Sequence, residues 1–140
     1  MITVVLTSCN RLDLLWRTVD SFMTYNDLPV SEFIIVDDSG KEDIHYQIRK
    51  SYPDCTLILE KRRGQIICID DAYSRVETPY IFHMEDDWEF CKGGFMQPSL
   101  EIIENDPRAM QVFICNQHDH PVESERHKVK KIEYQYLGDK

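Results

Sequence analysis

The sequence lacks the glycine-rich fingerprints of several common α/β enzymes. Among its 140 residues are five glycines, and they form neither a Gly-x-Gly-x-x-Gly segment nor a P-loop, nor the Gly-x-Ser-x-Gly turn that carries a nucleophilic serine. The first two motifs bring backbone close to phosphates, and the third exposes a serine hydroxyl above a sheet. Their absence argues against a Rossmann oxidoreductase, a P-loop NTPase and an α/β-hydrolase.

Positive charge is also scarce. Lysine and arginine number 16 against 25 acidic residues, which gives a formal net charge of -9. Sequence-independent binding to nucleic acid requires a basic surface, so we expect no nucleic-acid partner. A negatively charged substrate stays compatible with this charge, because a bound metal ion supplies positive charge locally.

The sequence has no Cys-x-x-Cys pair and no long apolar run. Its five cysteines are scattered, and the apolar segment 2–6 is too short for a signal peptide or a membrane span. An odd, unpatterned cysteine count is typical of reduced thiols. We therefore expect a cytoplasmic protein without a transmembrane segment, and peripheral association with a membrane stays open.

What the sequence does contain is a regular alternation of strand and helix patterns. Short β-rich runs occur at 2–7, 33–36, 56–59 and 80–84, and helical patterns lie between them at about 12–23, 42–51 and 65–76. A further helix is predicted at 96–105, and two more strands at 111–114 and 129–137. The alternation predicts an α/β fold, an αβα sandwich around a mostly parallel, Rossmann-like sheet, and the length fits a single domain over residues 1–140.

Three details of the helices are also predicted. Asn10 is expected to cap the first helix, because asparagine side chains accept hydrogen bonds from the first turn. The spacing of apolar residues places Trp16 in the core. In the helix at 65–76, Ile66, Ile69 and Tyr73 mark the expected inner face.

Polar residues follow each of the first four strands, in the segments 7–11, 37–38, 62–64 and 85–87. In parallel α/β sheets, ligands bind outside the carboxyl ends of the strands. The last segment is Glu85-Asp86-Asp87, and neighbouring carboxylates are best tolerated when a cation lies between them. An acidic loop facing water is the alternative for this segment alone, but the convergence of four segments favours a binding site.

These segments resemble the family 2 glycosyltransferases with a GT-A fold. The resemblance rests on the order of residues 4–11, Ile35-Val36-Asp37-Asp38-Ser39-Gly40 and residues 85–87, and it covers about residues 2–95. It implies a metal-dependent, inverting enzyme that uses Mn²⁺ or Mg²⁺. The donor would be a nucleoside-diphosphate sugar, and the acceptor a hydroxyl of a glycan, lipid or protein.

The resemblance also implies roles for individual residues. Asp87 and Glu85 correspond to the metal-binding positions, although the family usually has aspartate in place of Glu85. The implied nucleotide-sugar contacts are Thr7, Ser8, Asn10, Arg11, Asp37, Asp38, Arg63, Gly64, Asp70 and Asp86. Where the family usually has Ala-Arg-Asn, this chain has Cys68-Ile69-Asp70, so Arg62 or Arg63 is expected to contact phosphate instead.

The catalytic base is the least defined part of the prediction. Asp119 is the best candidate, and its neighbours His118 and His120, with His127, leave a zinc site as an alternative. The chain is short for the family, so the absence of part of the acceptor-binding half stays open. The alternatives to a transferase are a non-catalytic nucleotide-sugar-binding module and a sugar nucleotidyltransferase.

Overall fold

The computed structural model describes residues 1–114, which belong to two units of the chain. The first unit, Met1–Gly93, contains all the strands described below. The second unit begins at Gly94, and its described part contains helix α4 (Met96–Asn105). Asp119, His118, His120, His127 and the predicted strand at 129–137 lie outside the described residues.

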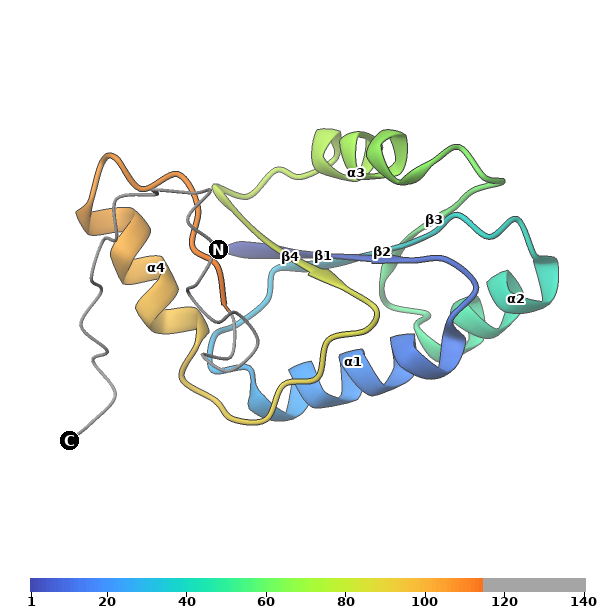
Figure 1. Cartoon of the computed structure of the whole chain (residues 1–140), viewed down its shortest axis with the longest axis horizontal. Helices are drawn as coiled ribbons and strands as arrows, with labels where there is room; N and C mark the ends of the chain where they lie inside the picture. Colours follow the sequence, from blue (N-terminus) through green and yellow to red (C-terminus); the bar gives the residue numbers. More distant parts are fainter. Residues whose placement is uncertain (115–140) are drawn as a thin grey trace, which may run out of the picture. The chain divides into compact units, whose positions relative to one another are not determined.

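The first unit is built on a four-stranded parallel sheet (Figure 1). Its strands are β1 (Ile2–Ser8), β2 (Glu32–Asp37), β3 (Thr56–Leu59) and β4 (Tyr80–Glu85), in the spatial order β3-β2-β1-β4. Helices α1 (Leu12–Tyr25), α2 (Glu42–Ser51) and α3 (Gln65–Ser74) connect them. The predicted α/β class and parallel sheet are confirmed, with each predicted strand of this unit found within two residues of its expected ends.

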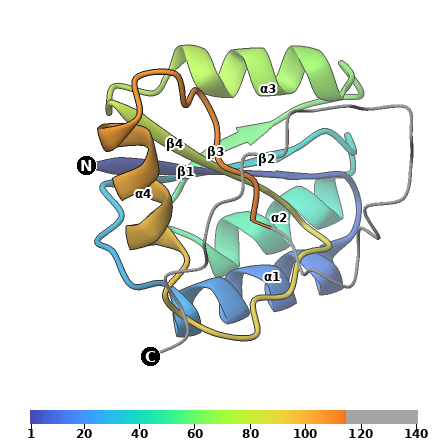
Figure 2. The ribbon, with the colours of Figure 1, turned by 60° about the vertical axis from the view of Figure 1, so that its left-hand side comes forward.

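The helices cover both faces of the sheet. Helix α3 lies on one side, and α1 and α2 lie on the other (Figures 1 and 2). All seven residues of β1 are buried, because this central strand has a neighbour on each edge and helices on both faces. The carboxyl ends of all four parallel strands therefore meet at one edge of the sheet.

Small residues of α3 pack against the face of the sheet that this helix covers. Cys68 is 2% exposed and Ala72 is fully buried, and both pack with apolar residues of β1, β2 and β3. The predicted inner face is wrong in part, since Ile66 is 79% and Tyr73 is 40% exposed. Small side chains let a helix lie close to the sheet, and this outweighs the larger apolar area of the isoleucine and the tyrosine.

The opposite face is centred on Phe22 of α1, whose ring stacks on Phe82 at 5.5 Å and meets Phe90 edge-on at 5.4 Å. The prediction that Trp16 is a core residue is wrong, because its side chain is 39% exposed. Trp16 lies beside the buried stripe of α1, and its indole N–H donates to Ser51 Oγ of α2 at 3.3 Å. The indole thus bridges two helices, and its polar N–H keeps it near the surface.

Two further predictions are corrected. Asn10 does not cap α1: the capping position is Arg11, without a side-chain capping bond, and Asn10 itself has a φ of 60°. The segment 111–114 forms no strand, and Phe113 is 80% exposed. Strand propensity produces a strand only where a neighbouring strand pairs with it, and none does so for this segment among residues 1–114.

No helix in the same part of the chain is long and apolar enough to cross a membrane.

Candidate functional site

The carboxyl ends of β2, β1 and β4 are joined by backbone hydrogen bonds that extend beyond the strands themselves. On one side of β1, the Asp38 N–H donates to the Ser8 carbonyl at 3.2 Å. On the other side, the Asp86 N–H donates to the Thr7 carbonyl at 3.1 Å. The polar segments that follow β1, β2 and β4 are therefore held side by side, as the sequence predicts.

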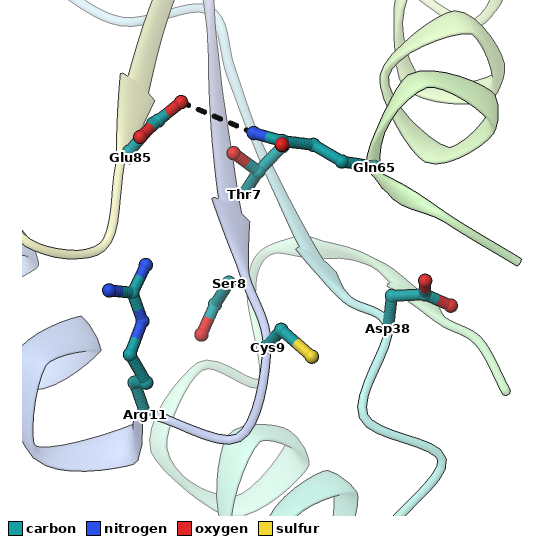
Figure 3. Close-up of a pocket in the computed structure, with 7 residues that line it drawn as sticks. All are labelled: Thr7, Ser8, Cys9, Arg11, Asp38, Gln65 and Glu85. Atoms are coloured by element: carbon teal, nitrogen blue, oxygen red, sulfur yellow. Dashed lines mark hydrogen bonds between the residues drawn. The ribbon is translucent and has the colours of Figure 1, made fainter. Parts of the chain in front are cut away.

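A pocket of ≈ 290 Å³ opens at this edge (Figure 3). Its lining residues come from the ends of β1, β2 and β4 and from the start of α1 and α3. They are Thr7, Ser8, Cys9, Arg11, Asp38, Gln65 and Glu85. Five of these seven are among the residues proposed from the sequence, and Cys9 and Gln65 are not.

Two hydroxyl groups of the pocket are buried without a hydrogen-bond partner. Thr7 is 8% and Ser8 is 7% exposed, and neither Thr7 Oγ1 nor Ser8 Oγ has a partner among the described residues. Buried polar atoms are nearly always hydrogen-bonded, because an unpaired one loses its hydration without compensation. This pair is therefore suited to receive the polar groups of a ligand.

The three carboxylates at the end of β4, one in its last position and two directly after it, have different surroundings. Glu85 lines the pocket, and its Oε1 accepts a hydrogen bond from Gln65 Nε2 at 3.2 Å (Figure 3). Asp86 is fully buried, and its carboxylate accepts from Arg11. The side chain of Asp87 is 46% exposed. Only Glu85 lines the pocket, whereas the other two are linked to it through Arg11.

Arg11 connects the pocket with the buried carboxylate. Its Nε donates to Asp86 Oδ2 at 3.1 Å and its Nη2 contacts Asp86 Oδ1, so the guanidinium contacts both oxygens of this carboxylate. Its Nη1 lies 3.3 Å from Asp87 Oδ2. Burial disfavours the charged form of Arg11, but the negative charges of Asp86 and Asp87 outweigh this effect and raise the pKa of Arg11. The planar fork suits a bidentate contact of this kind, which a lysine could not make.

The two aspartates at the end of β2, Asp37 in the strand and Asp38 directly after it, have different surroundings. Asp37 is fully buried, and both its oxygens accept hydrogen bonds from protein groups. Asp38 lines the pocket, and its oxygens accept the backbone N–H groups of Arg63 and Gly64, each at 2.7 Å. Of the two, Asp38 is therefore the one placed to meet a ligand, and it also holds the loop that leads into α3.

Arg63, Asp70 and Asn10 are the remaining residues proposed from the sequence. The guanidinium of Arg63 pairs with Glu60 at 2.9 Å and with Asp71 at 3.5 Å. Asp70 is exposed on α3, and Asn10 is exposed in the loop after β1. Hydrogen bonding to Glu60 raises the pKa of Arg63. None of these three side chains lines the described pocket.

Sequence reasoning missed three residues of this region. Cys9 lies within a predicted segment, and burial together with Asp37 and Asp38 raises the pKa of its thiol. Gln65 begins α3, a position at the same edge of the sheet. The third residue is His45, which contacts Asp37 from α2 at 3.0 Å. The alternation of strands and helices could have pointed to Gln65, but no motif points to His45.

The donor atoms suit a divalent cation that prefers oxygen. Magnesium and manganese commonly bind through one or two carboxylates, with phosphate oxygens and water completing the shell. Glu85 in the pocket and the half-exposed Asp87 supply carboxylate oxygens of this type. Residues 1–114 contain no group of three histidine, cysteine, aspartate or glutamate side chains that would hold a metal without a ligand.

The fold and this edge define the class of the protein: the structure has the parallel α/β arrangement of the GT-A glycosyltransferases. The model of the family "Glycosyl transferase family 2" matches residues 3–138, so the chain belongs to that family. No curated protein sequence is significantly similar to the chain.

Solved structures with a similar fold include two of TarS from S. aureus. One is described as TarS and the other as TarS 1-349; each has a TM-score of 0.56 and 16% identity and matches 74% of this chain. The mannosyltransferase PcManGT from Pyrobaculum calidifontis, in complex with GDP-Man and Mn2+, matches 61% of this chain at 21% identity with a TM-score of 0.49. The matches span 27% of PcManGT, and 19% and 32% of the two TarS chains.

Proposed function

We propose that the chain binds a nucleoside-diphosphate sugar at the carboxyl edge of its sheet and transfers the sugar to an acceptor hydroxyl. The observation that carries this proposal is the pocket, in which the unpaired hydroxyls of Thr7 and Ser8 lie near Asp38, Glu85 and Arg11. Hydroxyls and carboxylates together can bind the ribose and base of a nucleoside through its N–H and O–H groups. Membership of glycosyl transferase family 2 makes a nucleotide sugar the expected ligand.

In this proposal the nucleoside binds to the Thr7 and Ser8 hydroxyls and to Asp38. Asp38 is a hydrogen-bond acceptor held by two backbone N–H groups, so its position is fixed before a ligand arrives. A pre-positioned acceptor avoids the entropic cost of ordering a side chain on binding. Asp37 is given a different role, because it is fully buried and does not line the pocket.

The diphosphate would lie beside Arg11, close to Glu85 and Asp87. Glu85 and Asp87 would hold Mn²⁺ or Mg²⁺, which when bound neutralises the negative charge of the departing diphosphate. Arg11 remains anchored to the buried Asp86, and a guanidinium has five N–H donors, more than these contacts use. Its exposed side thus offers positive charge at the pocket's edge without leaving Asp86.

The chemistry expected at this site is a single displacement at the anomeric carbon, with inversion. The acceptor oxygen forms the new bond as the bond to the diphosphate breaks, and a carboxylate base removes the acceptor proton. Asp119 stays the candidate base. The acceptor would be a glycan, lipid or protein hydroxyl, and we propose a cytoplasmic location for the reaction.

Two other functions remain as alternatives. A non-catalytic module would bind the same ligand without turnover. A sugar nucleotidyltransferase would use a glycine-rich, basic loop after the first strand, but here this loop is Ser8-Cys9-Asn10-Arg11. The loop therefore favours transfer of the sugar over transfer of the nucleotide.

The test is turnover of the full chain with uridine, guanosine, cytidine and thymidine diphosphosugars, each with manganese or with a chelator. The proposal expects manganese-dependent release of one nucleoside diphosphate. Binding without release would establish the non-catalytic binding module. Release of pyrophosphate from a sugar phosphate and a nucleoside triphosphate would establish the nucleotidyltransferase. Absence of binding would refute the proposal.

A further inference from the structure

A buried carboxylate joins two loops at the edge of the sheet. Asp37, at the end of β2, has no exposed surface. Its Oδ2 accepts the backbone N–H of Asn10 at 3.0 Å, and its Oδ1 accepts the backbone N–H of Ser39 at 2.9 Å. The same Oδ1 lies 3.0 Å from His45 Nε2. Three groups from separate segments thus converge on one side chain.

The bond to Asn10 acts on the loop that shapes the pocket. Asn10 has a φ of 60°, in the left-handed region that is unfavourable for residues other than glycine, though asparagine tolerates it better than most. A backbone held in such a conformation needs surrounding contacts that fix it. The residues next to it, Cys9 and Arg11, both line the pocket, so the turn at Asn10 sets where they lie.

His45 supplies the one side-chain donor to this carboxylate among the residues described. It lies in α2 and is 4% exposed, so water does not compete for its contact. Because a carboxylate accepts hydrogen bonds, Nε2 must carry the hydrogen. Without this donor, Asp37 would stay buried but would lose one of the hydrogen bonds that compensate for its lost hydration. A buried carboxylate in this state moves or draws in water.

We propose that His45 is a positioning residue of the nucleotide site. By donating to Asp37 it holds the carboxylate where it fixes Asn10, and through Asn10 it places Ser8, Cys9 and Arg11 around the pocket. His45 itself lies outside the pocket lining, so it acts through the backbone of the loop. This inference rests on the proposed function for its effect on nucleotide binding, but its effect on the loop is independent of any ligand.

The test compares three variants of the full chain. His45→Leu removes the donor, and His45→Gln keeps an N–H at a similar distance from the backbone. Ile48→Val is the matched control, because Ile48 is a fully buried residue one turn further along α2 that is not part of the hydrogen-bonded group. It reports what a small loss of packing in α2 does alone.

Two measurements are made on each variant. Amide hydrogen exchange, followed by NMR, reads the Asn10 N–H against the amides of Val4 to Leu6 in the middle of β1. Calorimetry with uridine, guanosine, cytidine and thymidine diphosphates and manganese reads the Kd.

We expect His45→Leu to lower the protection of the Asn10 amide about tenfold or more while the β1 amides keep theirs. It should also raise the Kd about tenfold, equivalent to about 1.4 kcal/mol. His45→Gln should retain most of the Asn10 protection and most of the nucleotide affinity. Ile48→Val should lower neither the Asn10 protection relative to the β1 amides nor the affinity. If Asn10 protection and Kd are unchanged in His45→Leu, or if Ile48→Val reproduces both effects, the inference is wrong. Absence of binding to the wild type would instead refute the proposed function, and the exchange of Asn10 would still decide whether His45 holds the loop.

Discussion

The pair formed by Arg11 and Asp86 gives a prediction whose size follows from burial. Asp86 is fully buried and is gripped through both oxygens, while the Arg11 side chain is 45% exposed. Removing one partner of a fully buried ion pair costs about 3–5 kcal/mol, since the other charge is left buried and unpaired. Solvent around Arg11 screens part of this, so we expect Arg11→Gln to lower the free energy of unfolding by about 2–3 kcal/mol.

Arg49 provides a matched control. Its side chain is 46% exposed, nearly the same as that of Arg11, but its partner Glu42 is 80% exposed. Exposed ion pairs contribute little, so Arg49→Gln should cost less than about 0.5 kcal/mol. The contrast between the two arginines therefore isolates the effect of the partner's burial.

The assay is urea unfolding followed by circular dichroism, in a double-mutant cycle of Arg11→Gln and Asp86→Asn. The double variant removes both charges, so it should be more stable than the sum of the two losses predicts, by about 1–2 kcal/mol. A fall in Tm of roughly 6–12 °C should accompany Arg11→Gln. Additive effects within about 0.5 kcal/mol, or equal losses for Arg11→Gln and Arg49→Gln, would refute the reasoning.

Three further outcomes are expected. Asp87→Ala should abolish manganese-dependent binding of a nucleoside diphosphate, and an unchanged affinity in calorimetry would remove Asp87 from the metal site. Asp38→Ala should weaken nucleoside binding about 10- to 100-fold even with a chelator present, because a charge-assisted hydrogen bond is lost; a loss seen only with manganese would assign Asp38 to the metal instead. Burial and the nearby Asp38 raise the pKa of Cys68 to about 11 from 9.0, so the folded state holds this proton more tightly and stability should fall as the pH rises from about 9 to about 11. Urea unfolding across that range should show a smaller fall in Cys68→Ala, and equal slopes for variant and wild type would contradict the assignment.

Much of the fold follows from the pattern of the sequence. The runs at 2–7 and 33–36 are continuous and apolar because β1 and β2 are buried on both faces, and the alternation with helices leaves a parallel sheet as the natural arrangement. Local patterns failed where neighbouring elements decide the outcome. Ile66 is exposed because Cys68 and Ala72 fit closer to the sheet, and Asn10 has a left-handed φ with its N–H donated to the distant Asp37.

The same limit applies to the site. Parallel strands bring their carboxyl ends together, so Thr7, Ser8, Asp38 and Glu85 could be grouped from sequence alone. Which of two adjacent aspartates faces the pocket could not be predicted, because strand twist and loop contacts decide it. The contact of His45 with Asp37 could not be predicted either, since it depends on how α2 lies against the sheet.

The central claim is that the ends of β1, β2 and β4, together with the start of α3, form one nucleotide site. The most direct measurement is NMR of the full chain titrated with each nucleoside diphosphate, first with magnesium and then with paramagnetic manganese. We predict that shift changes concentrate in residues 7–11, Asp38, residues 64–65 and residues 85–87, and that manganese broadens residues 85–87 most strongly. Shift changes confined to another surface, or no saturable change with any of the four nucleotides, would contradict the claim.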